Sequence, residues 1–168
     1  ATTTEKPIYD PGMRSFVWAH AVPGLYHPCG TMQTAGSSFT WLKEQICRAE
    51  TAQAEAAGTN PFELINRAVE ATPAGARGLI FMPYLLGERS PRWNPRAKGG
   101  FVGLTMEHSR EDLCRAVVEG VILNLNVILE ILKEFLPVKE ITVIGGGARG
   151  PVWRRIMADI YGTEILMP

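Results

Sequence analysis

A glycine-rich turn between a strand-forming segment and a helix start is the feature that most constrains the fold of this chain. The β-branched residues of Ile141–Ile144 run into the sequence Gly-Gly-Gly-Ala-Arg-Gly at 145–150, and Pro151 opens the next helix. Proline is favoured at a first helical position, because its missing N–H would be unpaired there anyway. Glycines allow a ligand to approach the backbone closely, and a helix N-terminus carries a partial positive charge. Such a turn is suited to a phosphate or a ribose.

The turn alone leaves a purely structural role open, since glycines also serve tight turning and close packing. It is not a Walker A loop, because no Lys-Ser or Lys-Thr pair follows the glycines. The spacing Gly-x-Gly-x-x-Gly of dinucleotide-binding folds is met by Gly145, Gly147 and Gly150. The sequence ends, however, before an acidic residue about 20 positions further on that would contact a ribose hydroxyl.

Charge and cysteine usage exclude several classes of protein. The 168 residues include 17 Lys and Arg against 17 Asp and Glu, so no overall field favours nucleic acid or a membrane surface. Cys29, Cys47 and Cys114 are widely spaced, which argues against a disulfide framework or a zinc site and for a reducing cytosol. No apolar run reaches the roughly 20 residues that span a bilayer. We therefore expect a cytoplasmic protein.

The length suits one domain with a substantial core. The chain opens on a polar segment and closes in a strand-like segment, Ile165–Pro168, with no helix behind it to cover that strand. We therefore expect residues 1–168 to be a single partial domain, truncated at both ends. Asp10 is expected to lie in a frayed tail.

The first half of the chain predicts an antiparallel start followed by helices. Phe16–Ala21 and Thr31–Ala35 are expected to be paired strands, because turn residues separate them. One helix is expected over Phe39–Ala57, capped by the serines before it. Asn60 as N-cap with proline at the next position and an acidic residue three after the cap predicts a shorter helix to about Glu70.

In the second half, the apolar run Leu79–Leu86 predicts a buried strand, which Pro83 ends or distorts. A long loop follows over Glu88–Leu104, and loops of that length are more often functional than passive. Ser109 caps the strongest helix, which Pro137 ends and which is expected to bury one face.

Asn124 lies on the buried face of that helix and needs a hydrogen-bond partner. Strand Glu140–Ile144, helix Pro151–Tyr161 and strand Glu164–Leu166 complete the order. Together the elements indicate an α/β fold with a mixed sheet, an antiparallel start and helices on both faces.

Two stretches resemble the carboxyl-terminal domain of the FGGY carbohydrate kinases. The first begins Met-Pro-Tyr-Leu-Leu-Gly-Glu-Arg-Ser-Pro at Met82 and continues through the Gly-Gly-Phe-Val-Gly-Leu run at 99–104 to Asp112–Gly120. The second is Gly145–Arg149, with Trp153 behind it. Within that family the amino-acid sequence of the first stretch is most similar to that of the xylulokinases, and gluconokinases and other sugar kinases are nearly as similar.

The resemblance implies an actin- and hexokinase-like (ribonuclease H-like) ATPase fold and transfer of the terminal phosphoryl of ATP to a sugar such as xylulose, with Mg²⁺. It implies that Gly146, Gly147 and Ala148 contact the nucleotide, and the site is predicted to comprise Gly145, Gly146, Gly147, Ala148 and Arg149. Family members carry the catalytic base, the phosphate-binding turn and the Mg²⁺ carboxylates upstream, in the amino-terminal domain. No catalytic residue is therefore assigned to this chain, which is expected to be inactive alone.

Other readings stay open at this point. A non-catalytic actin-like ATP-binding module would not need the loop in this form, and a dinucleotide-dependent oxidoreductase rests on the glycine turn alone. Glu88 and Arg89 either clamp a substrate or anchor their loop. Whether the parent protein is a homodimer is undecided. The histidines lack metal-ligand spacing, and Trp18, Trp41 and Trp153 are expected in the core.

Overall fold

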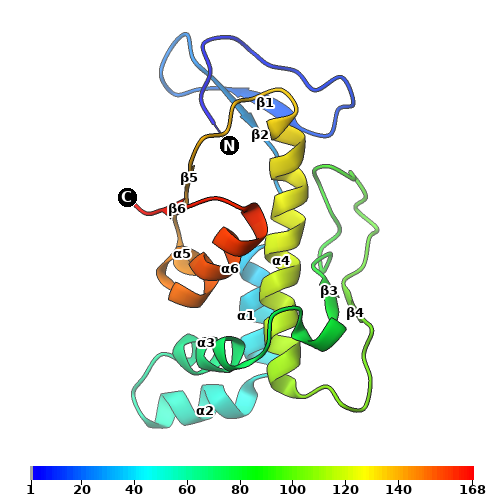
Figure 1. The fold of residues 1–168 in the computed structure, drawn as a ribbon, viewed down its shortest axis with the longest axis vertical. Helices are drawn as coiled ribbons and strands as arrows, with labels where there is room; N and C mark the ends of the chain where they lie inside the picture. The colour runs from blue at the N-terminus through cyan, green and yellow to red at the C-terminus, as the bar shows by residue number, and fades with distance from the viewer. Residues whose placement is uncertain (1) are drawn as a thin grey trace.

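The computed structural model describes residues 2–168, which are arranged around one long helix, α4 (Arg110–Lys133). In Figure 1 this helix runs along the long axis of the molecule. The strand pair near the N-terminus lies at one end, helices α2 and α3 lie at the other, and α5 and α6 flank one side. The remaining elements are β1 (Phe16–Ala19), β2 (Tyr26–Cys29), α1 (Gly36–Gln45), α2 (Arg48–Ala56), α3 (Pro61–Ala71), a 3₁₀ turn (Ala76–Gly78), β3 (Ile80–Met82), β4 (Gly100–Val102), β5 (Ile141–Thr142), α5 (Gly146–Arg149), α6 (Pro151–Tyr161) and β6 (Ile165–Leu166).

Helix α4 begins with the predicted capping box. The Asp112 carboxylate accepts a hydrogen bond from the Ser109 backbone N–H at 2.8 Å, and the Ser109 side chain accepts one from the Asp112 backbone N–H in return. Every residue from 114 to 122 is buried, so this part of the helix is enclosed on all sides rather than along one face as expected. The two charges in this stretch neutralise each other, because Arg115 Nε lies 2.5 Å from Glu119 Oε1.

The strands form three separate two-stranded sheets within residues 2–168, not one continuous mixed sheet. β1 pairs with β2 and β3 with β4, both antiparallel, whereas β5 pairs with β6 in parallel. The antiparallel start and the mixed α/β composition agree with the sequence-based prediction. The helices pack mainly on α4 rather than on a broad sheet, as Figure 1 shows.

Two predicted elements lie elsewhere. The second strand is Tyr26–Cys29, not Thr31–Ala35, because the chain reverses within the Pro-Gly turn and pairs at once with β1. The expected single helix over Phe39–Ala57 is two helices. The chain leaves helical geometry at Cys47, whose N–H bonds back to the Leu42 carbonyl at 2.9 Å and whose carbonyl starts α2.

Strand β3 is shorter than the apolar run that predicted it. Only Phe81 is buried there, while Ile80 and Met82 are exposed, so the run alternates instead of being enclosed. The Phe81 backbone packs closely against α4 at Gly120, which has no side chain. A Cβ at this position would overlap with the Phe81 carbonyl oxygen. The long loop after β3 is not wholly irregular, since it contains β4.

Tryptophan placement follows the prediction only in part. Trp153 is 4% exposed and Trp41 is partly buried against Phe81 at 6.1 Å between ring centroids. Trp18, by contrast, is 60% exposed on the β1–β2 pair. The two-stranded sheet of β1 and β2 leaves one face open to solvent, so a place in a strand did not bury the Trp18 side chain.

The base of the long loop is anchored by a buried polar cluster. Glu88 is 3% exposed and accepts the Gln33 backbone N–H at 3.0 Å and the Asn124 amide Nδ2 at 2.7 Å. Asn124, the buried amide that needed a partner, also accepts at 3.3 Å from the Tyr84 hydroxyl. Glu88 therefore fixes the loop to α4 through hydrogen bonds to neutral groups, and not through the salt bridge with Arg89 that a loop anchor was expected to use.

Replacing Asn124 with leucine should destabilise the fold by about 1 to 3 kcal/mol, because it leaves a buried Glu88 oxygen without its donor. Asn126→Leu is a matched control in the same helix. Its Oδ1 is buried without a hydrogen-bond partner in the part of the chain that the structure describes, so its loss should leave stability unchanged or slightly raised. Urea unfolding followed by circular dichroism measures both, and equal destabilisation of the two variants would contradict the anchor.

The segment around Asp10 is fixed rather than frayed. Arg14 donates to Asp10 through Nε and Nη2, both at 2.9 Å, and to Glu134 through Nη1 and Nη2 at 3.0 and 2.6 Å. The backbone N–H groups of Gly12 and Arg14 also bond the Asp10 carboxylate. One guanidinium thus ties the beginning of the chain to the end of α4.

The Arg14 hydrogen bonds lower the pKa of Asp10 from its ordinary 3.8 to about 2. Because the folded pKa lies below the unfolded one, this carboxylate stabilises the fold above pH 4 and the contribution is lost as the pH falls to about 2. Asp10→Asn should therefore weaken the fall in stability over that interval. Thermal unfolding between pH 5 and 2 tests it, and identical acid profiles for variant and wild type would be the contrary result.

Candidate functional site

The glycine turn forms one short helical turn, α5, between β5 and α6. Strand β5 ends at Thr142, two residues earlier than predicted, and Ile144 is 80% exposed. Gly145 then adopts φ +96°, a conformation that favours glycine because it has no Cβ. Around Gly145 and Gly146 a Cβ would meet no atom within 4 Å. The turn is therefore open to solvent and not packed shut.

The helix behind the turn offers fewer free amides than its position suggests. Pro151 has no N–H, and the amides of Trp153 and Arg154 donate to the Gly150 carbonyl at 3.1 and 3.3 Å. The 11-residue helix α6 still directs the positive end of its dipole toward the turn. Its contribution to an anion is thus mainly electrostatic.

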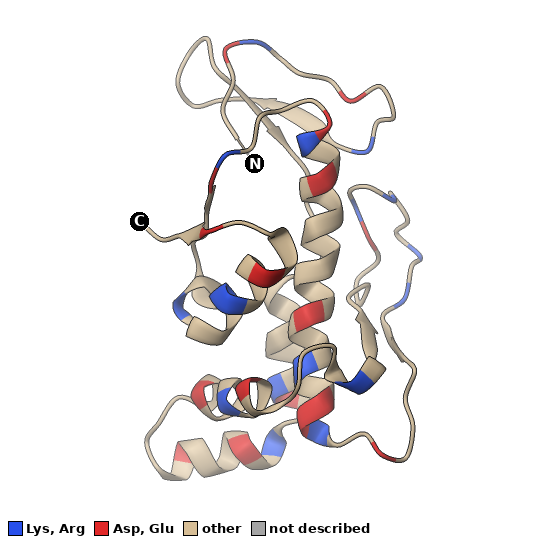
Figure 2. Cartoon of the chain, viewed as in Figure 1, with Lys and Arg blue, Asp and Glu red and all other residues tan. Residues whose placement is uncertain are grey.

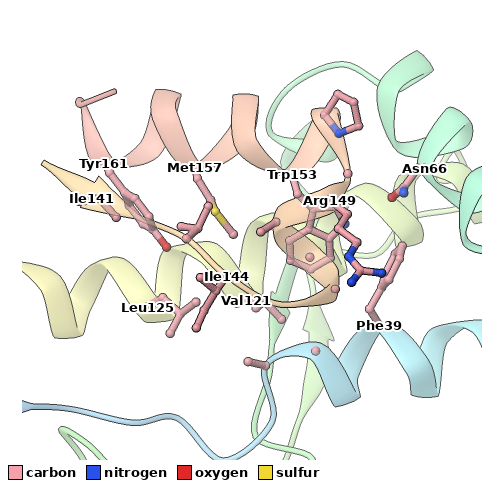
Figure 3. A pocket seen from close by; sticks show the side chains of 18 of the residues that line it. Phe39, Asn66, Val121, Leu125, Ile141, Ile144, Arg149, Trp153, Met157 and Tyr161 are labelled. Atoms are coloured by element: carbon pink, nitrogen blue, oxygen red, sulfur yellow. The ribbon is translucent and has the colours of Figure 1, made fainter. Parts of the chain in front are cut away.

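The turn borders a cavity of about 1200 Å³. Its walls come from α1, α3, α4, β5 and the 146–161 segment. An aromatic cluster lies beneath the turn: Phe39 contacts both Phe62 and Trp153, each at 5.2 Å between ring centroids. Figure 3 shows Asn66 and Arg149 near Phe39 at one end, and Leu125, Ile141 and Tyr161 at the other. One end is therefore mixed polar and aromatic, and the other is apolar.

Four of the five predicted site residues line this cavity: Gly146, Gly147, Ala148 and Arg149. Gly145 does not line it, and contributes the backbone reversal that places the other four. Gly147 sits over the Trp153 ring, with 3.6 Å between its would-be Cβ and the nearest ring carbon. The structure thus brings the predicted segment together with a concave surface.

Sequence reasoning missed the residues that α1 and α3 bring to the cavity. Gly36, Phe39 and Thr40 start α1, and Asn66 lies on α3 beside Gly150, whose would-be Cβ is 3.3 Å from Nδ2. Phe39 was predicted only as part of a helix. A glycine at a helix start was the one local signal, and it could not show which distant turn would face it.

Of the three basic residues near the turn, only Arg149 is left for a ligand. Arg154 donates to the Ala148 carbonyl at 2.6 Å, and Arg155 pairs with Glu70 at 3.0 Å on the outside of α6. Arg149 is exposed and lines the cavity. Figure 2 shows these basic positions on α5 and α6. At the other end, burial raises the pKa of Tyr161 to about 12, so its hydroxyl is neutral at pH 7.

Side chains that commonly bind metals do not cluster within residues 2–168. No group of three His, Cys, Asp or Glu side chains lies close enough to hold an ion in this part of the chain. Among the helices at 2–168, none is both long enough and apolar enough to cross a membrane.

Comparison with known proteins gives a family match along the whole described chain. Residues 2–168 match the FGGY family of carbohydrate kinases, C-terminal domain. A gluconokinase of Bacillus licheniformis is 39% identical over 98% of this chain and 32% of its own length. A xylulose kinase of Staphylococcus epidermidis is 34% identical over 94% of this chain and 29% of its own.

Solved structures agree with the sequence match. A xylulose kinase from Rhodospirillum rubrum superposes with a TM-score of 0.80 at 32% identity, covering 98% of this chain and 31% of that one. A gluconate kinase from Lactobacillus acidophilus gives 0.81 at 32% identity, covering 99% and 32%. The chain spans about a third of the length of these relatives, and its fold is the actin- and hexokinase-like fold of their kind. It belongs to the FGGY family of carbohydrate kinases and corresponds to the carboxyl-terminal domain of that family.

Proposed function

We propose that this chain is the nucleotide-side domain of an ATP-dependent sugar kinase. The observation that carries the proposal is the glycine turn at 146–150, which opens on the large cavity and belongs to a chain of this family. In the proposed arrangement the cavity holds the adenosine part of ATP, and the terminal phosphoryl projects toward the amino-terminal domain of the same enzyme. The sugar hydroxyl then attacks that phosphorus.

Three features of the cavity support a nucleotide. The exposed Gly146 backbone lets a ribose approach without a side chain in its way. The buried Phe39 and Trp153 rings form an apolar floor beneath the turn, which gives this part of the cavity an apolar character suited to a purine. Arg149 supplies one positive charge near the N-terminus of α6, where phosphate oxygens are stabilised.

The sugar is proposed as a class rather than as one compound. The loop at 82–91 resembles that of xylulokinases most, yet the gluconokinase of Bacillus licheniformis is 39% identical and the xylulose kinase of Staphylococcus epidermidis 34%. Preference for xylulose therefore gains no support from these comparisons. We keep a ketose such as xylulose and an aldonate such as gluconate as the two substrates to be tested.

Chemistry at the phosphorus depends on positioning and charge stabilisation, and a base must accept the proton of the hydroxyl. In this proposal residues 2–168 supply the surface that holds the nucleotide. The base and the Mg²⁺ carboxylates are accordingly proposed to lie in the amino-terminal domain. The chain alone binds ATP in this proposal but transfers no phosphoryl group.

Two other functions are less well supported. A dinucleotide-dependent oxidoreductase would need a parallel sheet of several strands around the glycine turn, whereas β5 and β6 form an isolated two-stranded parallel pair and the chain starts with an antiparallel pair. A non-catalytic ATP-binding module would not need the loop at 88–104, yet the buried Glu88 holds this loop in a defined position.

We also propose a cytosolic location for the kinase, because its three cysteines are free. Whether the whole enzyme forms a homodimer is open.

Arg149→Ala should weaken ATP binding about fivefold, which corresponds to about 1 kcal/mol for one charge-assisted contact at an exposed position. Arg155→Ala is the matched control, because Arg155 is also exposed and basic but pairs with Glu70 on the outer side of α6. Its affinity for ATP should equal that of wild type. Quenching of tryptophan fluorescence measures both, and equal effects of the two variants would reject the role of Arg149.

Phosphoryl transfer should appear only when a complementary amino-terminal domain is supplied. The isolated chain with ATP and Mg²⁺ should produce no ADP in the presence of xylulose or gluconate. A chimera in which this chain replaces the matching third of the Bacillus licheniformis gluconokinase should turn over. Coupled ADP assays with each sugar decide the point: activity of the chain alone would refute the division of labour, and an inactive, folded chimera that binds no ATP would refute the nucleotide domain.

A further inference from the structure

Two buried cysteines from distant parts of the chain meet in the core. Cys47 Sγ lies 3.4 Å from Cys114 Sγ, although 67 positions separate them in the sequence. The side chains are 1% and 2% exposed, and both belong to the main hydrophobic cluster. This contact takes no part in the proposed nucleotide site, because neither residue lines its cavity.

The two thiols sit on different elements with different freedom. Cys114 is held inside α4, whereas Cys47 is the residue between α1 and α2, with non-helical φ −98° and ψ +42°. The chain at Cys47 is thus not locked in a continuous helical ladder. Cys47 still has backbone hydrogen bonds to both helices, because its N–H donates to the Leu42 carbonyl and its own carbonyl accepts the Thr51 N–H.

The charges around the pair differ for the two sulfurs. With Cys114 as the hydrogen-bond donor, its S–H lowers the pKa of the Cys47 thiol, while the same contact and burial raise the pKa of Cys114. Burial and the Glu50 carboxylate oppose this lowering of the Cys47 pKa, and Arg110, which pairs with Glu50 at 2.6 Å, adds a smaller lowering. Cys47 is therefore the sulfur that becomes a thiolate first.

We propose that Cys47 and Cys114 form a redox site of this domain, at which a hydroperoxide oxidant converts the two thiols into one intramolecular disulfide. The site is independent of the nucleotide cavity and of the sugar that the enzyme uses. It would make the protein sensitive to oxidation in a compartment that otherwise keeps its cysteines reduced.

The reaction balances with the oxidant named. The Cys47 thiolate attacks one oxygen of hydrogen peroxide, the O–O bond breaks, and the departing hydroxide takes up the proton that Cys47 lost, giving a sulfenic acid and water. Cys114 sulfur then attacks the Cys47 sulfur and expels the hydroxyl, which leaves as water with the Cys114 proton. Two thiols lose two electrons in total, and the peroxide gains them.

The disulfide would connect the α1–α2 junction to α4. Both elements also supply walls of the cavity, through Phe39 on α1 and Val121 and Leu125 on α4. A cross-link closing a loop of this length restricts the unfolded chain, so the oxidised form should unfold at a higher temperature than the reduced form.

The test uses the whole chain, reduced and then exposed to hydrogen peroxide under native conditions. Non-reducing peptide mapping by mass spectrometry should find one cross-linked peptide pair, containing Cys47 and Cys114, with the mass of two hydrogens lost and restored by dithiothreitol. Wild-type protein suffices for this measurement, so it does not depend on a variant folding. Recovery of both residues as free thiols, or as sulfinic and sulfonic acids without the cross-link, would overturn the proposal.

Cys29 offers a matched control, because it is a buried cysteine, 5% exposed, with no sulfur contact among the described residues. Cys29→Ser should keep both the cross-link and the rise in Tm on oxidation. Cys47→Ser and Cys114→Ser should each abolish them. A cross-link that includes Cys29, or a rise in Tm that persists in Cys114→Ser, would refute the assigned pair.

Discussion

The middle of α4 is buried on all sides, and the other elements are arranged around it. Every residue of this helix from 114 to 122 is buried, so the elements that contact this stretch are positioned by how they pack against it. The close approach of β3 requires Gly120, where any side chain would collide with the Phe81 backbone. The Arg115 and Glu119 pair, which also receives the Gly75 N–H at 3.1 Å, keeps the two buried charges compensated.

The two segments that carry the family resemblance are fixed to opposite sides of this helix. The loop after β3 is attached through Glu88 and Asn124, and the glycine turn is carried by α6, which packs on α4 through Trp153 and its neighbours. Figure 1 shows the loop and the turn on different sides of α4. The turn opens on the cavity, whereas the loop holds exposed basic residues away from it.

Local signals in the sequence predicted whatever is stabilised by neighbouring residues. The capping box at Ser109, the Asn60 cap followed by proline, and the start of α6 at Pro151 were all found, because each depends on hydrogen bonds within one turn of helix. Strand extent was predicted poorly. Leu79–Leu86 and Ile141–Ile144 are apolar enough for strands, but a strand continues only as far as a partner strand pairs with it.

The candidate site shows the same division. Gly145–Arg149 could be identified from the sequence, because a strand, a run of glycines and a helix start follow one another within a few residues. The sequence motifs of the family around them are also distinctive. The contributions of Phe39 and Asn66 could not, because they reach the cavity from helices that are about 80 to 110 positions away in the chain. The Cys47 and Cys114 contact was hidden for that reason as well.

The starts of α3, α4 and α6, the need of Asn124 for a partner and the membership in a kinase family followed from the amino-acid sequence alone, because these rest on hydrogen bonds between near neighbours and on the order of motifs. Only the tertiary structure decided that α4 is enclosed, that Asp10 is held by Arg14, and that a turn, two helices and an aromatic cluster surround one cavity. Those outcomes depend on packing between segments far apart in the chain, and packing is settled by shape and volume in three dimensions.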